Sequence, residues 1–290
     1  MCGRPSRDTV AIEHSVDALS SRLAIARSRS AVTGSRARRV GTRGRLPRVV
    51  EVAPGIRRIG PGLANVYLLE EAGGVTIVDA GMPGYWRALA AELATMGRSL
   101  GDVRAVVLTH AHTDHIGFAE RIRSERGVPI RVHELDELRA KGQVPGPSKL
   151  GSYKVMPLLG FLLFGLRNGL LRAPPILEVA TFGDGATLDV PGAPRVIHVP
   201  GHTAGSAALH FVRREVICVG DAFVTRNVIN GVTGPQLFPN FNADNDQAYA
   251  SLARLDGVDA RLVLPGHGDP WDRGLAEAVR LARERGLAPR

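Results

Sequence analysis

The chain has 290 residues, of which 44% are hydrophobic and 22% charged, so it is long and apolar enough to bury a sizeable core. Its net charge of +9 comes almost entirely from residues 1–48, where 11 Arg face three acidic side chains. The nearly neutral remainder offers no extended basic surface, so nucleic acid is not favoured as a partner.

Residues 1–48 are rich in Arg and Ser and hold only short apolar stretches, which predicts a basic, disordered N-terminal extension. A transit-like peptide, a basic arm for nucleic acid and an artefact of an upstream start codon are the alternatives. The rest of the chain, 49–290, is expected to form one domain.

Beyond residue 48, short apolar runs bounded by turn signals alternate with stretches of helical spacing. The first half predicts strands 49–52, 56–59, 65–70, 75–79, 105–108 and 128–132, with helices 85–96 and 116–126. An irregular, apolar insertion is expected over 136–175. The second half predicts strands 195–199, 206–210, 215–219 and 261–264, with helices 246–255 and 274–285. This alternation predicts an α/β (α+β) fold in which two mixed β-sheets pack together with helices outside.

The most informative stretch is His110-Ala-His112-Thr-Asp114-His115, which directly follows the predicted strand 105–108. The chain holds only 9 His, so three of them within six residues is a marked concentration. Imidazole nitrogens and carboxylate oxygens are the ligands that first-row metals take in such clusters. The stretch therefore predicts a metal site at the end of a strand.

Three further residues are candidates for the same site. His202 and His267 each follow an apolar strand through a Pro-Gly turn, and Asp221 follows the strand 215–219. Two metals need about six protein ligands and a bridge. His110, His112 and His202 are expected to hold one ion, Asp114, His115 and His267 the other, and the Asp221 carboxylate to span both.

With these motifs in order, the chain resembles the metallo-β-lactamase superfamily over about residues 50–270. The motifs are His110-x-His112-x-Asp114-His115, Gly201-His202-Thr203, Gly220-Asp221 and Gly266-His267, with Asp79-Ala-Gly81 as a further match. The resemblance implies an αββα sandwich with a two-metal site, commonly zinc, at one edge; Fe and Mn are the alternatives. Asp79 is expected to orient a ligand histidine rather than to bind metal itself.

The chain departs from several branches of this superfamily. True β-lactamases with a Cys ligand have Cys at the position of Asp221. Quorum-signal lactonases have Tyr at the position of Val224. Glyoxalase II-like thioesterases carry a long extension after the last metal histidine, whereas only 23 residues follow His267. A single-iron sulfur dioxygenase would not need Asp114, His115 and His267 as ligands. None of these branches is a close match.

The expected activity is metal-dependent hydrolysis, in which a hydroxide bound by two metals attacks an ester, thioester or lactone bond of a small, partly apolar substrate. Asp114 is the candidate catalytic residue, as a proton relay to the leaving group. The alternatives are a nucleic-acid phosphodiesterase, a single-iron sulfur dioxygenase and a metal-binding protein without enzymatic activity. The cysteines, Cys2 and Cys218, predict no disulfide, so a cytoplasmic location is expected.

The segment 155–171 is the other clue to the substrate. Its uncharged run, 155–166, has 12 residues and falls short of the ~20 that a membrane-spanning helix needs. It is expected to be a core helix or a homodimer contact, an apolar lid over the metal cleft, or an interfacial membrane contact. The loop 222–245 is expected to line the same cleft with Phe223, Arg226, Phe238 and Phe241.

Overall fold

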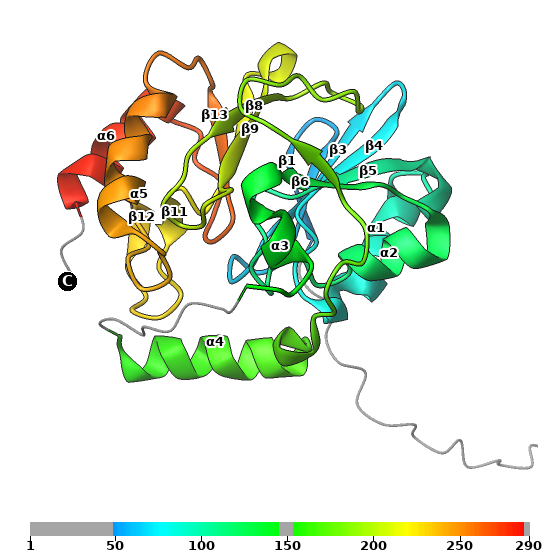
Figure 1. Cartoon of the computed structure of the whole chain (residues 1–290), viewed down its shortest axis with the longest axis horizontal. Helices are drawn as coiled ribbons and strands as arrows, with labels where there is room; N and C mark the ends of the chain where they lie inside the picture. The colour runs from blue at the N-terminus through cyan, green and yellow to red at the C-terminus, as the bar shows by residue number, and fades with distance from the viewer. Residues whose placement is uncertain (1–48, 145–152, 287–290) are drawn as a thin grey trace, which may run out of the picture. The chain divides into compact units, whose positions relative to one another are not determined.

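The computed structural model describes residues 49–144 and 153–286 (Figure 1). The predictions for residues 1–48 lie outside the described residues. Contacts group residues 44–290 into one compact unit, and everything below concerns this unit.

The first sheet has seven strands in sequence order. Its first four strands pair antiparallel, and from β4 onwards each pair is parallel, so the sheet is mixed. The strands are β1 (Val49–Ala53), β2 (Ile56–Ile59), β3 (Val66–Glu71), β4 (Gly74–Val78), β5 (Val103–Val107), β6 (Ile130–His133) and β7 (Ala180–Phe182).

The second sheet has four strands in the order β13-β10-β9-β8, and it is also mixed. The pair β10–β13 is parallel, whereas β9 runs antiparallel to both of its neighbours, so β8, β10 and β13 point the same way. Its strands are β8 (Arg195–His198), β9 (Ala207–Phe211), β10 (Val216–Gly220) and β13 (Leu262–Pro265). A separate two-stranded sheet pairs β11 (Val224–Arg226) with β12 (Thr233–Gln236).

Alternating side chains divide the core into layers. Along β5, Ala105 and Val107 belong to the core between the two sheets, whereas Val106 packs on the helix side of its sheet. The helices α1 (Trp86–Thr95) and α2 (Ala119–Arg126) cover the first sheet, and α5 (Asn245–Ser251) and α6 (Leu275–Arg285) cover the second. Figure 1 shows the sheets between these two pairs of helices, which confirms the αββα sandwich.

The structure differs from the sequence expectation mainly in its short elements. Strands β7, β11 and β12 were not predicted. The first two have only three residues, and β12 reads Thr-Gly-Pro-Gln, in which Gly and Pro indicate a turn rather than a strand. The segment expected to be irregular contains the helices α3 (Glu137–Ala140) and α4 (Val155–Arg167). The expectation of irregularity was wrong for α4 because its run has no polar residues to mark a helical period, whereas the helix offered as an alternative for 155–171 is confirmed.

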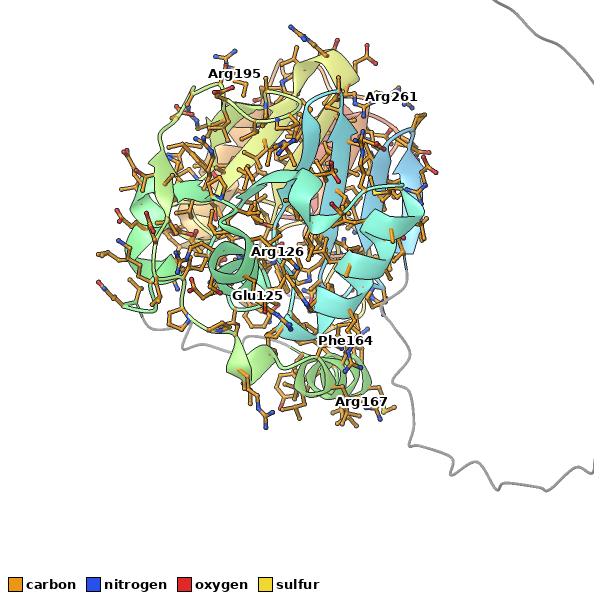
Figure 2. All side chains as sticks on the ribbon, turned by 90° about the vertical axis from the view of Figure 1, so that its right-hand side faces the viewer. Glu125, Arg126, Phe164, Arg167, Arg195 and Arg261 are labelled. Carbon is orange, nitrogen blue, oxygen red and sulfur yellow. The ribbon has the colours of Figure 1, made fainter. Side chains whose placement is uncertain are left out.

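Helix α4 lies along the lower edge of the ribbon in Figure 1 and is attached at both ends. The backbone N–H of Lys154 donates to the carbonyl of Ile229 at 2.9 Å, and that of Gly84 donates to the carbonyl of Asn168 at 2.9 Å. Between these ends Phe164 makes an edge contact with Tyr85, with ring centroids 6.3 Å apart. Figure 2 views α4 almost end-on, with Phe164 on the side facing the body.

In the part of the chain that the structure describes, no helix is long and apolar enough to cross a membrane.

One close backbone contact positions the turn that carries the His cluster. The N–H of Gly117 donates to the carbonyl of Gly81 at 2.8 Å, and a Cβ on Gly117 would lie 2.3 Å from the carbonyl carbon of Met82. We expect Gly117→Ala to lower the free energy of unfolding by about 1–3 kcal/mol in urea titrations, because backbone must move.

Gly160 supplies the matched control for that substitution. It is also glycine, but it lies within α4 and a Cβ there would meet nothing within 4 Å. Gly160→Ala should leave stability unchanged or raise it by up to about 1 kcal/mol, since alanine favours helix. Equal effects of the two substitutions would contradict the packing account of Gly117.

Candidate metal centre

The predicted site residues lie on loops that follow four strands. The stretch from His110 to His115 follows β5, His202 follows β8, Asp221 follows β10 and His267 follows β13. Because β8, β10 and β13 run in the same direction, their carboxyl ends meet at one edge of the second sheet. Loops at strand ends hold functional groups on a rigid support.

The first group consists of His110, His112 and His202, whose potential ligand atoms all lie within 4.8 Å of one another. The Nδ1 of His112 and the Nε2 of His202 are 2.9 Å apart. The ring centroid of His110 lies 4.9 Å from that of His112 and 4.7 Å from that of His202. The structure thus brings together the three imidazoles that the sequence assigned to one ion.

The second group consists of Asp114, His115 and His267, and it meets the same 4.8 Å limit. The Oδ2 of Asp114 lies 3.5 Å from the Nε2 of His267 and 3.9 Å from the Nε2 of His115. These are again the residues that the sequence grouped together. His110, His115 and Asp221 form a third group within the same limit, and the ring centroids of His110 and His115 are 4.0 Å apart, so His110 lies beside both sets.

Asp221 lies between the two groups. Its Oδ2 is 3.4 Å from the Nε2 of His202, which belongs to the first group. The same oxygen is 3.1 Å from the Nε2 of His267 and 3.8 Å from that of His115, which belong to the second. The side chain is only 2% exposed. One buried carboxylate oxygen therefore faces imidazoles from both groups, as expected for a spanning residue.

Four of the histidines use their other ring nitrogen to contact a fixed oxygen. This is the arrangement by which proteins orient metal-binding imidazoles and set their tautomer. The pairs are His110 Nδ1 with Thr109 Oγ1 (3.2 Å), His115 Nδ1 with Asp79 Oδ2 (2.9 Å), His202 Nδ1 with Asn242 Oδ1 (2.9 Å) and His267 Nδ1 with the Leu63 carbonyl (2.6 Å).

Asp79 sits at the end of β4 in the left-handed region, with φ +62°. Its Oδ1 accepts a hydrogen bond from the Thr109 N–H at 2.8 Å, while its Oδ2 contacts the ring of His115 at 2.9 Å. This position, behind the ring of His115, is the one expected for an orienting residue.

Asp136 is a buried carboxylate that the sequence reasoning missed. Its Oδ2 accepts hydrogen bonds from the Ala111 N–H at 2.9 Å and the Thr203 hydroxyl at 2.8 Å. Its Oδ1 accepts one from the Gly205 N–H at 3.0 Å. Asp136 therefore ties the loop of His110 and His112 to the loop of His202. No local sequence pattern predicts these contacts.

The first group is electrically neutral at ordinary pH. Burial lowers the pKa of His110, His112 and His202 below its usual value, so these imidazoles do not take up protons near pH 7. Neutral imidazole is the form that binds a metal ion.

The second group behaves differently because carboxylates surround it. Burial lowers the pKa of His115, but Asp79, Asp114 and Asp221 outweigh it and raise that pKa to about 10. For His267, too, burial acts to lower the pKa, but Asp221 raises it above its usual value. Burial opposes ionisation of Asp221, yet the two imidazoles hold its pKa well below the ordinary range. A proton on His115 thus balances part of the buried negative charge.

The donor set fits divalent metal ions. Among the seven candidate ligands, three buried atoms have no hydrogen-bond partner: the Nε2 atoms of His110 and His115 and the Oδ1 of Asp221. Leaving such atoms unsatisfied is costly, and a bound ion would satisfy them. Five imidazoles and two carboxylates are the nitrogen and oxygen ligands that Zn, Fe and Mn accept.

A cavity of about 430 Å³ opens beside the two groups. Site residues on its wall include His112, Asp114, His202, Asp221 and His267, and its apolar lining includes Phe161, Leu170, Phe238 and Phe241. The expectation that Phe223 and Arg226 line the cleft was wrong. Phe223 is fully buried in the core beneath α5 and α6, and Arg226 lines a separate cavity.

The sequence profile of the metallo-beta-lactamase superfamily matches residues 59–267. The chain is 28% identical to the probable metallo-hydrolase YflN of Bacillus subtilis, over 72% of this chain and 81% of that one. Among solved structures it resembles the metallo-beta-lactamase family protein TTHA1429 from Thermus thermophilus, with 26% identity, a TM-score of 0.58 and coverage of 81% and 78%. It also resembles TTHA1623 in a di-iron-bound form, with 27% identity, a TM-score of 0.53 and coverage of 74% and 93%.

The chain therefore belongs to the metallo-β-lactamase superfamily. Its His and Asp groups are of the types that hold metal ions, and the relative YflN is described as a probable metallo-hydrolase.

The contrast between the two groups predicts a pH dependence of metal binding. An ion entering the second group must displace the proton from His115, whose pKa is about 10. Affinity there should rise with pH from neutrality towards pH 10, by about tenfold per pH unit for each proton displaced. The first group, with its lowered pKa values, should show no such rise above neutral pH.

Calorimetric titration with Zn²⁺ in buffers of different ionisation enthalpy would count the protons released. Asp79→Asn removes the charge that contributes most to raising the pKa of His115, so it should release fewer protons than the wild type. Metal binding without proton release near neutral pH would contradict the assignment.

Asp136→Asn tests the tie between the two loops. The substitution keeps the size of the side chain but replaces one carboxylate oxygen, which accepts hydrogen bonds, with an NH2 group that would face N–H or O–H donors. We expect stability to fall by about 1–3 kcal/mol and metal affinity by about 10–100-fold, measured by urea unfolding and competitive metal titration. The exposed neighbour Glu134, changed to Gln, is the control and should alter neither. Unchanged metal affinity in Asp136→Asn would show that the tie is dispensable.

Proposed function

We propose that the chain hydrolyses an ester, thioester or lactone bond in a small, partly apolar substrate, using two divalent metal ions. The observation that carries this proposal is the position of Asp221, whose Oδ2 faces His202 on one side and His115 and His267 on the other. A buried carboxylate so placed suits a bridge between two ions.

One ion would be held by His110, His112 and His202, and the other by Asp114, His115 and His267. Two ions there would supply an activated water and polarise the substrate oxygen. We favour Zn²⁺, with iron as the alternative because the similar TTHA1623 was solved in a di-iron-bound form. Asp79, Asn242 and the carbonyl of Leu63 orient the imidazoles from behind.

We propose that Asp114 transfers the proton of the attacking water to the leaving group. It is 14% exposed, more than Asp221, and it lines the cavity. Its Oδ2 lies close to both imidazoles of the second group. This carboxylate would take a proton from the attacking water and pass it to the leaving group, as general acid–base catalysis requires.

The cavity favours a carboxylic ester, thioester or lactone over a nucleic acid. Its size lies in the range of small-molecule sites, and Phe161, Leu170, Phe238 and Phe241 give it an apolar wall. Among the described residues that line it, Arg139 is the one Arg or Lys. A site that held a polynucleotide would need several cations along the phosphate backbone.

A panel of probes tests the proposed reaction. Metal-loaded protein should cleave nitrophenyl esters, acyl thioesters and lactones faster than bis-nitrophenyl phosphate, with rates read from the released chromophore or thiol. Preference for the phosphodiester would contradict the proposal.

Asp114→Asn tests the proton transfer with the probe that is cleaved best. It should lower kcat by about 10²–10⁴-fold, since it removes a general acid–base group. The exposed Asp189, changed to Asn, is the matched control and should keep full activity. If Asp114→Asn retains both metals and full turnover, the proton relay is wrong.

A further inference from the structure

The outward side of α4 is apolar and exposed along its whole length. We call six side chains its outer face: Val155, Met156, Leu159, Leu162, Leu163 and Leu166, each between 45% and 74% exposed. Their spacing of three and four residues places them on one side of a helix. Single exposed leucines are ordinary, but a contiguous apolar stripe of this kind marks an interaction surface.

The opposite side of α4 is occupied by the protein itself. Phe161 and Gly165 are buried, and Phe161 lines the cavity beside the metal centre. Leu158 and Phe164 pack against the same core. The helix is thus held against the body through one side, which leaves the outer face pointing away from it.

The charged residues on α4 and next to it in the sequence are all positive. Lys154 precedes the helix, Arg167 ends it and Arg172 follows closely, and all three are exposed. The sequence from 153 to 172 contains no acidic residue. An apolar stripe flanked by cations is complementary to an anionic lipid surface. The apolar side chains contact the acyl chains, and the cations pair with the headgroups.

We propose that the outer face of α4 docks on an anionic membrane surface, with the helix lying in the interfacial plane. Its 13 residues are too few to cross a bilayer, which takes about 20. Burial of the stripe by about one side-chain depth is the mode of interfacial helices. This inference is independent of the proposed reaction, because it concerns the side of the helix away from the cavity.

Charge also argues for lipid over a second copy of the chain. A two-fold contact between outer faces would bring Lys154 of one copy near Arg167 of the other, or like residues together, depending on the direction of the helices. The 153–172 segment offers no acid to offset this repulsion. An anionic lipid surface neutralises both ends of the helix at once.

Co-sedimentation of the full chain with vesicles tests the docking without any need for turnover. The vesicles are phosphatidylcholine alone and phosphatidylcholine mixed with phosphatidylglycerol. The full chain should partition preferentially into the mixed vesicles. The combined variant Leu159→Gln, Leu163→Gln and Leu166→Gln should bind them at least about tenfold more weakly. Lys154→Gln and Arg167→Gln should each lower the affinity for the mixed vesicles by about fivefold and change the affinity for phosphatidylcholine vesicles little.

The control pair is Leu177→Gln with Val212→Gln, which are 71% and 56% exposed and lie outside α4. It should bind as the wild type does. Undiminished binding of the Leu159, Leu163 and Leu166 variant would overturn the proposal, since the basic residues 1–48 would then be responsible. Absence of vesicle binding in the wild type would also overturn it, as would a stable dimer, seen in sedimentation velocity, that this variant abolishes.

Leu162→Trp gives a second measurement that does not depend on how polar variants fold. Its emission should shift to the blue when mixed vesicles are added, because an exposed position enters an apolar layer. An unshifted spectrum with the protein bound to vesicles would show that another surface makes the contact.

Discussion

The candidate site depends on one buried charge, the carboxylate of Asp221. Its Oδ2 lies 3.1–3.8 Å from imidazole nitrogens of His115, His202 and His267, which arrive on three different loops. Burial opposes ionisation, and the imidazoles outweigh that cost and hold its pKa well below the ordinary range. The same charge can be balanced by protons on the imidazoles or by metal ions. The residues can therefore keep one arrangement with or without metal.

The backbone is built to let these loops approach one another. A Cβ on Gly266 would lie 2.2 Å from the Oδ1 of Asp221, so only glycine allows the loop of His267 to pass that carboxylate. A Cβ on Gly205 would lie 2.6 Å from the backbone nitrogen of Asp136, which ties the His202 loop to the loop after β5. The turns, carboxylates and imidazoles are thus in contact with one another. Helix α4 adds Phe161 to the wall of the cavity beside them.

The sequence was sufficient for the αββα fold and for bringing the seven candidate ligands to one place, because each ligand follows a strand and carries a local signal. Their division between two ions stays a prediction, since His110 also forms a group with His115 and Asp221. It was insufficient for Asp136 and Asn242. Their contacts to Thr203 and His202 span 67 and 40 residues, and neither belongs to a recognisable motif. For 155–171 the sequence offered a helix but could not say which side is buried, since a uniformly apolar run has no period, and only the structure separates the buried side of α4 from its exposed one.

The central claim is that Asp221 joins two metal sites. Metal content after loading with Zn²⁺ and removal of free ion, measured by elemental analysis on wild type and Asp221→Ala, tests it directly. The account predicts two ions per chain in the wild type and at most one in the variant, because the spanning carboxylate is lost. One ion in the wild type, or two in the variant, would contradict it.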